Sequence, residues 1–148
     1  MLTALSLGFY FFFVNQSGPK KILLRSKNCE LLQQECVFNY QGKNVLRLYF
    51  DPKKVNNKEP FMVHTELLDS DHMLVDKMEL KLQGIEMNLN FFADLFTKNG
   101  KDFSVEARLP FCTLKKMGWK VLLNFQATYK DSKDSKVFYI VQEINVIN

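Results

Sequence analysis

Apolar and polar residues alternate along most of the chain, which is the pattern of β-strands that bury one face. With a period of two, every second side chain lies on the same side of the strand. The runs 45–50, 61–67 and 77–82 alternate in this way, and the run 137–144 mixes apolar residues on both sides. The three clearest runs have as apolar members Ile85, Met87, Leu89 and Phe91, then Phe103, Val105, Ala107 and Leu109, then Trp119, Val121, Leu123, Phe125 and Ala127. The pattern therefore predicts an all-β domain.

Turn sequences separate these runs at the spacing of hairpins. The segments 41–44 and 98–101 each contain a glycine suited to positive φ. With 22–25 and 37–40 included, the chain has seven or eight predicted strands, while residues 91–97 fit either a short helix or a strand. Such a series of strands without a long amphipathic helix predicts an immunoglobulin-like antiparallel β-sandwich.

The beginning of the chain has a different pattern. Residues 1–14, MLTALSLGFYFFFV, carry no charge. A membrane-spanning helix needs about 17–25 residues, and counting on to Gly18 reaches the lower end of this range. A signal peptide and a buried segment of the domain are alternatives. Because no basic residue precedes the apolar run and Val14 to Gly18 offers no small-residue cleavage site, we expect an N-terminal hydrophobic anchor helix at 1–18, followed by a β-sandwich domain at 19–148.

Two cysteines determine the predicted compartment. Cys29 and Cys36 enclose six residues between two predicted strands, a separation that a disulfide can close in an oxidising compartment. Two free thiols on a cytoplasmic loop are the alternative, and Lys20 and Lys21 would favour a cytoplasmic domain by the positive-inside rule. We expect the disulfide, and hence a single-pass protein of the inner (cytoplasmic) membrane with its domain in the periplasm. Cys112 is then an unpaired thiol.

Size and charge restrict the possible partners. The 148 residues, 47% hydrophobic and 24% charged, suffice for one globular domain. The net charge of +4 comes from basic and acidic residues that are mostly interspersed, which argues against a nucleic-acid partner. The densest basic stretch, Lys20, Lys21, Arg25 and Lys27, either faces anionic lipid head groups or is a solvated linker. Membrane lipid, contacted through the N-terminal segment, is the first predicted partner.

The chain offers little for catalysis but contains soft donors. No nucleophile elbow, P-loop, zinc-protease or dinucleotide-binding motif occurs, so we expect a protein that is not an enzyme. Thioether, thiolate and imidazole groups suit Cu(I). Met73 is expected in an exposed loop, while the inward parity of Met87 fits core packing as well. The candidate copper ligands are Met87, Cys112 and His64, with His72 and Met73 as further donors.

Two segments carry a family resemblance: GIEMNLN at 84–90 and LPFCTLKKMGW at 109–119. They are similar to a group of membrane-anchored proteobacterial proteins of uncharacterised role and, more distantly, to the FixH and YtkA-like domains. The resemblance implies one N-terminal span, an extracytoplasmic immunoglobulin-like sandwich and a role in copper handling or haem-copper oxidase assembly. Met87 and Cys112 are the matching positions. Leu89 stands where the group often has a second Met, which removes one soft donor.

Two functions are therefore predicted. The first is a non-catalytic, membrane-anchored interaction or accessory protein, in which one sheet face or edge meets a membrane-protein partner. The alternative is an accessory protein that handles copper or assists the assembly of haem-copper oxidases. Copper is the one cofactor considered, and the first function needs none.

Overall fold

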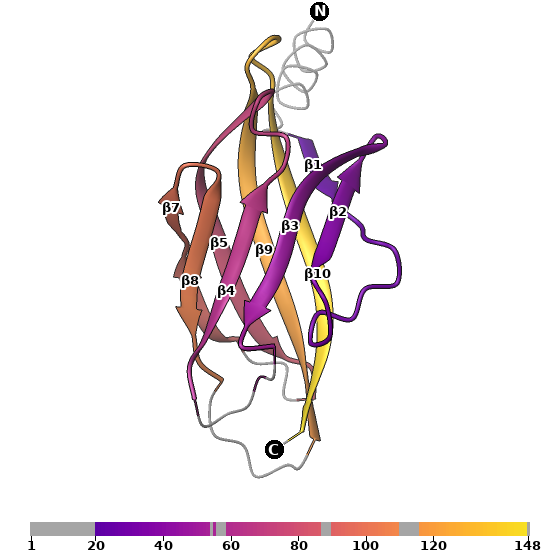
Figure 1. The fold of residues 1–148 in the computed structure, drawn as a ribbon, viewed down its shortest axis with the longest axis vertical. Coiled ribbons are helices and arrows are strands. Elements are labelled where there is room, and N and C mark those ends of the chain that lie inside the picture. The colour runs from indigo at the N-terminus through magenta and orange to yellow at the C-terminus, as the bar shows by residue number, and fades with distance from the viewer. Residues whose placement is uncertain (1–19, 54, 56–58, 87–89, 110–115, 148) are drawn as a thin grey trace, which may run out of the picture.

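The computed structural model describes residues 20–53, 55, 59–86, 90–109 and 116–147. Within these ranges the backbone forms ten strands and no helix, which confirms the all-β prediction. The longer strands run along the long axis of the molecule (Figure 1). In chain order they are β1 (Lys20–Leu23), β2 (Cys36–Tyr40), β3 (Lys43–Asp51), β4 (Phe61–Leu67), β5 (Met73–Gly84), β6 (Asn90–Leu95), β7 (Thr97–Asn99), β8 (Asp102–Ala107), β9 (Lys116–Tyr129) and β10 (Ser135–Ile147).

The strands form two five-stranded sheets that pack face to face as a sandwich (Figure 1). The first sheet, called sheet A, has the order β1-β10-β9-β5-β6, and the second, sheet B, has the order β2-β3-β4-β8-β7. All neighbouring strands are antiparallel except β1 and β10, which run parallel with Lys20 opposite Lys136. This parallel pair departs from the purely antiparallel sandwich predicted from the sequence.

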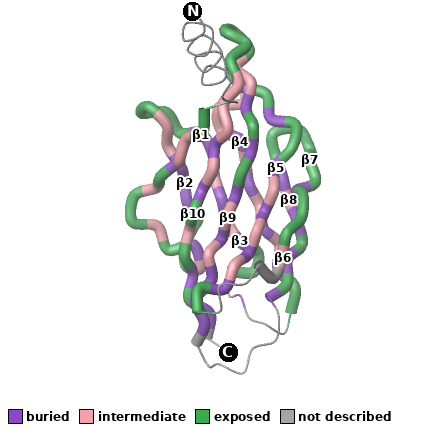
Figure 2. Tube along the Cα trace, turned by 180° about the vertical axis from the view of Figure 1, so that it is seen from behind, coloured by how far each residue is buried: buried purple, intermediate pink, exposed green. Residues whose placement is uncertain are grey.

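The core lies between the sheets and is made of the inward members of the alternating runs. Figure 2 shows buried and less buried positions alternating along the long strands. In β9, the positions from Trp119 to Ala127 with odd numbers are all at most 2% exposed. Phe125 and Phe138 bring their ring centroids to 5.5 Å across β9 and β10. The predicted inward faces of β8 and β9 are therefore confirmed, because burial of apolar area is what fixes the facing of these strands.

The strand predicted over residues 85–91 is wrong at its start, and residues 87–89 of it lie outside the described residues. Strand β5 ends at Gly84, and Ile85 and Glu86 form a turn. The Glu86 carboxylate accepts the N–H of Gly118 at 3.2 Å, which holds the turn against β9. The apolar positions change from even numbers, at Met78, Leu80 and Leu82, to odd numbers from Ile85 onward. This change of phase lies next to the end of β5, but the pattern does not show that a turn follows it.

The number of strands also exceeds the predicted seven or eight. Residues 91–97, which fitted a short helix or a strand, belong to β6 and β7 with one residue between them. Strand β5 begins at Met73, before the predicted run, and contains a bulge between Val75 and Met78. Both residues are buried although three positions separate them. A β-bulge adds one residue to a strand and reverses the parity beyond it, which conceals the first part of β5 from a period-two reading.

One long edge of the sandwich is closed by the segment between β1 and β2. The Leu24 N–H donates to the Tyr139 carbonyl in sheet A at 2.9 Å, and the Arg25 carbonyl accepts the Asn39 N–H of sheet B at 3.1 Å. Two adjacent residues thus hydrogen-bond to both sheets. At the opposite edge Phe96 alone connects β6 of sheet A to β7 of sheet B, and its N–H donates to the Met78 carbonyl at 2.9 Å.

A disulfide holds the loop that follows residue 25. Cys29 and Cys36 are bonded, with their Cα atoms 5.7 Å apart, and this is the pair predicted from the sequence. Cys36 is fully buried, and Leu31 inside the loop is 1% exposed. Gln142 of β10 donates its side-chain N–H to the Cys29 carbonyl at 2.9 Å. The disulfide loop is therefore part of the core at this edge and not a free surface loop.

The predicted anchor, residues 1–18, lies outside the described residues. Across the part of the chain that the structure describes, no helix has the length and apolar character needed to cross a membrane.

Replacement of Leu31 by Ala tests whether the disulfide loop belongs to the core. Leu31→Ala is expected to lower the free energy of unfolding by about 2–5 kcal/mol, the usual loss for a leucine truncated in a core. Leu74→Ala is the matched control, because Leu74 is 52% exposed and its loss is expected to stay within about 0.5 kcal/mol. Urea unfolding of both oxidised variants measures the difference, and equal losses would show that Leu31 contributes nothing to the core.

Candidate functional site

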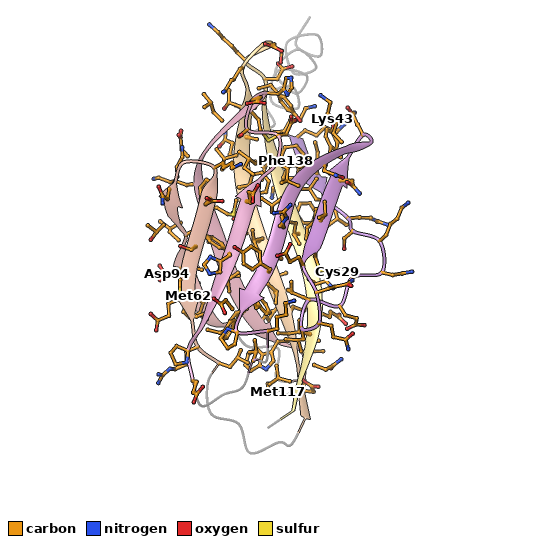
Figure 3. The ribbon with its side chains drawn as sticks, viewed as in Figure 1. Cys29, Lys43, Met62, Asp94, Met117 and Phe138 are labelled. Atoms are coloured by element: carbon orange, nitrogen blue, oxygen red, sulfur yellow. A yellow bond between two sulfur atoms is a disulfide. The ribbon has the colours of Figure 1, made fainter. Side chains whose placement is uncertain are left out.

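A pocket of about 340 Å³ opens at the end of the sandwich where three turns meet. These are the β2–β3 turn, the β4–β5 turn and the β9–β10 turn, and we call the cavity the end pocket. Figure 3 shows Lys43, which follows the first of these turns, at the upper end of the molecule and Met117 at the lower end. The pocket volume is in the range of small-molecule sites. Polar residues dominate its lining.

Local backbone conformations shape the pocket walls. Gln41 and Gly42 have φ values of 50° and 78°, and this left-handed pair turns the chain between β2 and β3. Lys133 has a φ of 59° in the β9–β10 turn, and its N–H donates to the Tyr129 carbonyl at 2.9 Å. The Lys130 N–H donates to the His72 carbonyl at 2.9 Å, which fixes the β4–β5 turn to the end of β9. Backbone hydrogen bonds thus fix the β4–β5 and β9–β10 walls, and the left-handed residues fix the β2–β3 wall.

The floor of the pocket is formed by inward positions at the ends of strands. Lys136 has the inward parity of Phe138 in β10, and its ammonium lies 5.2 Å from the Tyr40 ring centroid and 5.1 Å from that of Tyr129. Its Nζ also donates to the Tyr40 hydroxyl at 3.3 Å. The Tyr40 ring meets Phe138 edge to face at 5.3 Å. The lysine thus stands directly above the aromatic core, where cation–π contacts with two rings hold it.

An acidic wall faces this lysine. The Asp69 carboxylate accepts a hydrogen bond from the His72 ring, with 2.8 Å between Oδ1 and Nδ1. The Asp69 side chain is 13% exposed and that of His72 52%. Asp131 and Asp134, both exposed, line the pocket from the β9–β10 turn. The pocket therefore combines ammonium, imidazole, hydroxyl and carboxylate groups on one concave surface.

The pKa of Tyr129 reports the burial of this site. Burial raises the pKa of Tyr129 above its ordinary value, because an ionised phenol loses solvation there. The positive charge of Lys136 lowers the pKa in opposition, while Tyr40 and Asp69 raise it further. The phenol is therefore neutral at physiological pH and is available as a hydrogen-bond donor and acceptor.

The predicted copper ligands do not come together among the described residues. His64 lies on the outer face of sheet B, half-buried, with its ring stacked on that of Tyr49 at 5.0 Å and an interplanar angle of 18°. Met87 and Cys112 lie outside the described residues. The expectation of an exposed Met73 is wrong, because Met73 begins β5 and is 1% exposed in the core. In the described parts of the chain, no group of three or more His, Cys, Asp or Glu side chains could hold a metal ion.

The sequence pattern does not reveal the end pocket. Its residues come from turns far apart in the chain, and each turn alone reads as a solvated polar segment. One signal was present: Lys136 has the inward parity of the apolar residues Phe138 and Ile140 in β10. A charged residue at such a position is a reason to expect a partner or a ligand at the end of a sheet.

Ionisation of Tyr129 should reduce stability at high pH. A tyrosine whose folded pKa exceeds its unfolded value adds stability below the unfolded pKa and loses it as the pH rises through the folded pKa. The free energy of unfolding of the native chain should therefore fall more steeply above a pH of about 10 than that of Tyr129→Phe. Denaturant unfolding across this range measures both slopes. Equal slopes would mean that Tyr129 is as solvated in the fold as in the unfolded chain.

Comparisons with protein-family models, curated proteins and solved structures found no match for the chain. The resemblance to the FixH and YtkA-like domains therefore stays a prediction from the sequence, as does the copper role that it implies.

Proposed function

We propose that the chain is a non-catalytic binding module, anchored in the inner membrane by residues 1–18, whose sandwich lies in the periplasm and meets a membrane-protein partner. The observation that carries this proposal is the bond between Cys29 and Cys36. Disulfides that form part of a fold are characteristic of oxidising compartments and rare in the cytosol. The disulfide supports a location outside the cytoplasm in spite of Lys20 and Lys21, which the positive-inside rule alone would keep inside.

The apolar N-terminal sequence supports the anchor. Residues 1–14 contain no charged side chain, and such a stretch is stable in lipid and unfavourable in water. The first described strand begins at Lys20, immediately after the polar residues 15–19. Five extended residues span at most about 18 Å. The sandwich would therefore stay close to the membrane surface.

The register of β1 supports one orientation of the sandwich. Lys20 lies opposite Lys136, which belongs to the floor of the end pocket. Neighbouring strands are about 4.8 Å apart, so the chain joins the sandwich beside the end pocket. In the proposed arrangement the end pocket faces the lipid and the opposite end of the sandwich faces the periplasm. Lys20 and Lys21 are both exposed at this end, where they can meet anionic head groups.

The immunoglobulin-like class is part of the proposal. In constant-type immunoglobulin domains, strands A, B, E and D form one sheet and C, F and G the other. The neighbours β4, β8 and β7 correspond to B, E and D, and β5, β9 and β10 correspond to C, F and G. The chain changes sheets between β4 and β5 and between β8 and β9, as the correspondence requires. The disulfide differs from that of antibody domains, since it closes the loop before β2 and does not join the B- and F-type strands.

Thiol labelling of intact and lysed bacterial cells tests the compartment. The full chain carrying Cys112→Ser leaves Cys29 and Cys36 as the two reporters. We expect no maleimide labelling of cells or lysate in denaturant until a reductant is added, because both sulfurs are in the disulfide. The control variant, Cys29→Ser with Cys112→Ser, leaves one thiol and should label in denaturant without reductant. Labelling of both cysteines without reductant would place the domain in a reducing compartment.

Membrane fractionation tests the anchor separately. The full chain is expected in the membrane fraction after a high-pH carbonate wash, and removal of residues 2–14 should move it to a soluble fraction. The matched control shortens the polar segment by removal of residues 15–17, which leaves the apolar stretch intact and should leave the protein in the membrane. Recovery of the intact chain in a soluble fraction would contradict the anchor, whatever the state of the cysteines.

A further inference from the structure

We propose that the end pocket binds a small zwitterion that carries a phosphate and an ammonium group, the chemistry of phosphoethanolamine. The phosphate oxygens would meet the Lys136 ammonium, and the ligand's ammonium would meet the carboxylates of Asp131 and Asp134. The assignment of a ligand class rests on contacts within the pocket, while its lipid source rests on the proposed function.

Lys136 is the group that would bind the anionic part of the ligand. Its side chain is half-buried at an inward position, and its Nζ donates a hydrogen bond to the Tyr40 hydroxyl at 3.3 Å. Among the described residues no carboxylate lies within ion-pair distance of its Nζ. A partly desolvated ammonium without a counter-charge is unfavourable. With three N–H donors, Lys136 can give two further hydrogen bonds to phosphate oxygens.

The flanking tyrosine rings fix this ammonium in place. Their centroids lie 5.2 Å and 5.1 Å from Nζ, so the ammonium is held between Tyr40 and Tyr129. A lysine normally loses much side-chain entropy when it binds a ligand. Here the cation–π contacts have already restricted Lys136 before the ligand arrives, which favours binding. Lys43 lines the same pocket and adds a second positive charge.

The carboxylates supply the other half of the site. Asp69 is engaged with His72 at 2.8 Å, whereas Asp131 and Asp134 form no ion pair within the described ranges. The described carboxylate and imidazole groups are not arranged to share a metal ion. An organic ammonium has three N–H donors that point apart, so it can bridge carboxylates that are too far apart for one metal ion.

The balance of charges favours a zwitterion over either ion alone. The charged lining residues are Lys43 and Lys136 against Asp69, Asp131 and Asp134, and Asp69 is hydrogen-bonded to His72. A simple anion would be repelled by the carboxylates, and a simple cation by the two lysines. A ligand that carries both charges can pair its anionic group with the lysines and its cationic group with the aspartates. A volume of about 340 Å³ accommodates a headgroup of this size.

Titration of the full chain in a sugar-headgroup detergent tests the ligand class. Isothermal titration calorimetry would compare phosphoethanolamine with inorganic phosphate and with ethanolamine. We expect phosphoethanolamine to bind more tightly than either part. Lys136→Gln should weaken both phosphoethanolamine and phosphate by at least about 10-fold, the effect of one charge-assisted hydrogen bond. The double variant Asp131→Asn with Asp134→Asn should weaken phosphoethanolamine similarly but leave phosphate unchanged or bound more tightly.

Two controls keep the result interpretable. Lys120→Gln removes a lysine of β9 that does not line the pocket and should leave all three affinities unchanged. The double aspartate variant changes exposed turn residues, so it tests the site even if Lys136→Gln destabilises the fold. A loss of phosphoethanolamine binding without a loss of phosphate binding in that variant cannot arise from unfolding. Phosphoethanolamine binding no tighter than phosphate, or affinities unchanged in both pocket variants, would overturn the proposal.

Nanodiscs distinguish a lipid headgroup from a free compound. The full chain is placed in phosphatidylcholine discs with and without phosphatidylethanolamine, and the amide NMR signals of Ser132 and Lys136 are followed. Shifts that depend on phosphatidylethanolamine and vanish in Lys136→Gln identify the lipid. Binding in detergent without such shifts supports the ligand class with a free source and contradicts the membrane-facing orientation. Failure of the chain to enter discs contradicts the anchor and leaves the detergent result valid.

Discussion

Closure of both long edges of the sandwich is the constraint that holds the two sheets in one arrangement. The apolar layer attracts the sheets without direction, since burial of apolar area depends little on their relative position. Direction comes from backbone hydrogen bonds. Leu24 and Arg25 bond to different sheets, and Phe96 passes from one sheet to the other within a single residue. These connections fix the mutual position of the sheets, and the Cys29–Cys36 bond keeps the adjoining loop in the core.

The end pocket is a consequence of this fixed arrangement. The inward faces of β2, β9 and β10 continue beyond the apolar layer to Tyr40, Tyr129 and Lys136. Strand β2 belongs to sheet B, whereas β9 and β10 belong to sheet A. The three side chains therefore approach one another only when the two sheets are held in register. Packing of Tyr40 against Phe138 transmits that register to the pocket floor. The geometry of the end pocket thus depends on the same contacts that stabilise the middle of the sandwich.

The sequence predicts what depends on local alternation and misses what depends on where the chain reverses or crosses. The runs 103–107 and 119–127 keep one phase throughout, and their inward members are buried as predicted. The apolar phase changes between Leu82 and Ile85, but alternation alone does not show that Ile85 and Glu86 form a turn. The strands β1 and β7 have four and three residues, which is too short for a period to be recognised. Their positions depend on long-range hydrogen bonds.

The candidate sites differ in the same way. The disulfide could be predicted because seven positions of sequence separate its cysteines, so a short loop brings them together. The end pocket could not, because Tyr40 and Lys136 are 96 positions apart and meet only in the folded sandwich. His64 looked like a free ligand in the sequence, but it stacks on Tyr49 of the neighbouring strand. Only the pairing of β3 with β4 brings that aromatic partner alongside.

The parallel pairing of β1 with β10 gives the molecule a mechanical polarity. Strand β1 starts at Lys20, and β10 ends at Ile147 near the other end of the sandwich (Figure 1). A tensile load applied between these two residues would pull the two strands in opposite directions along their length. All hydrogen bonds of the pair would then bear the load together in shear and would not open one after another. The short first strand is thus well placed to resist traction on the chain ahead of it.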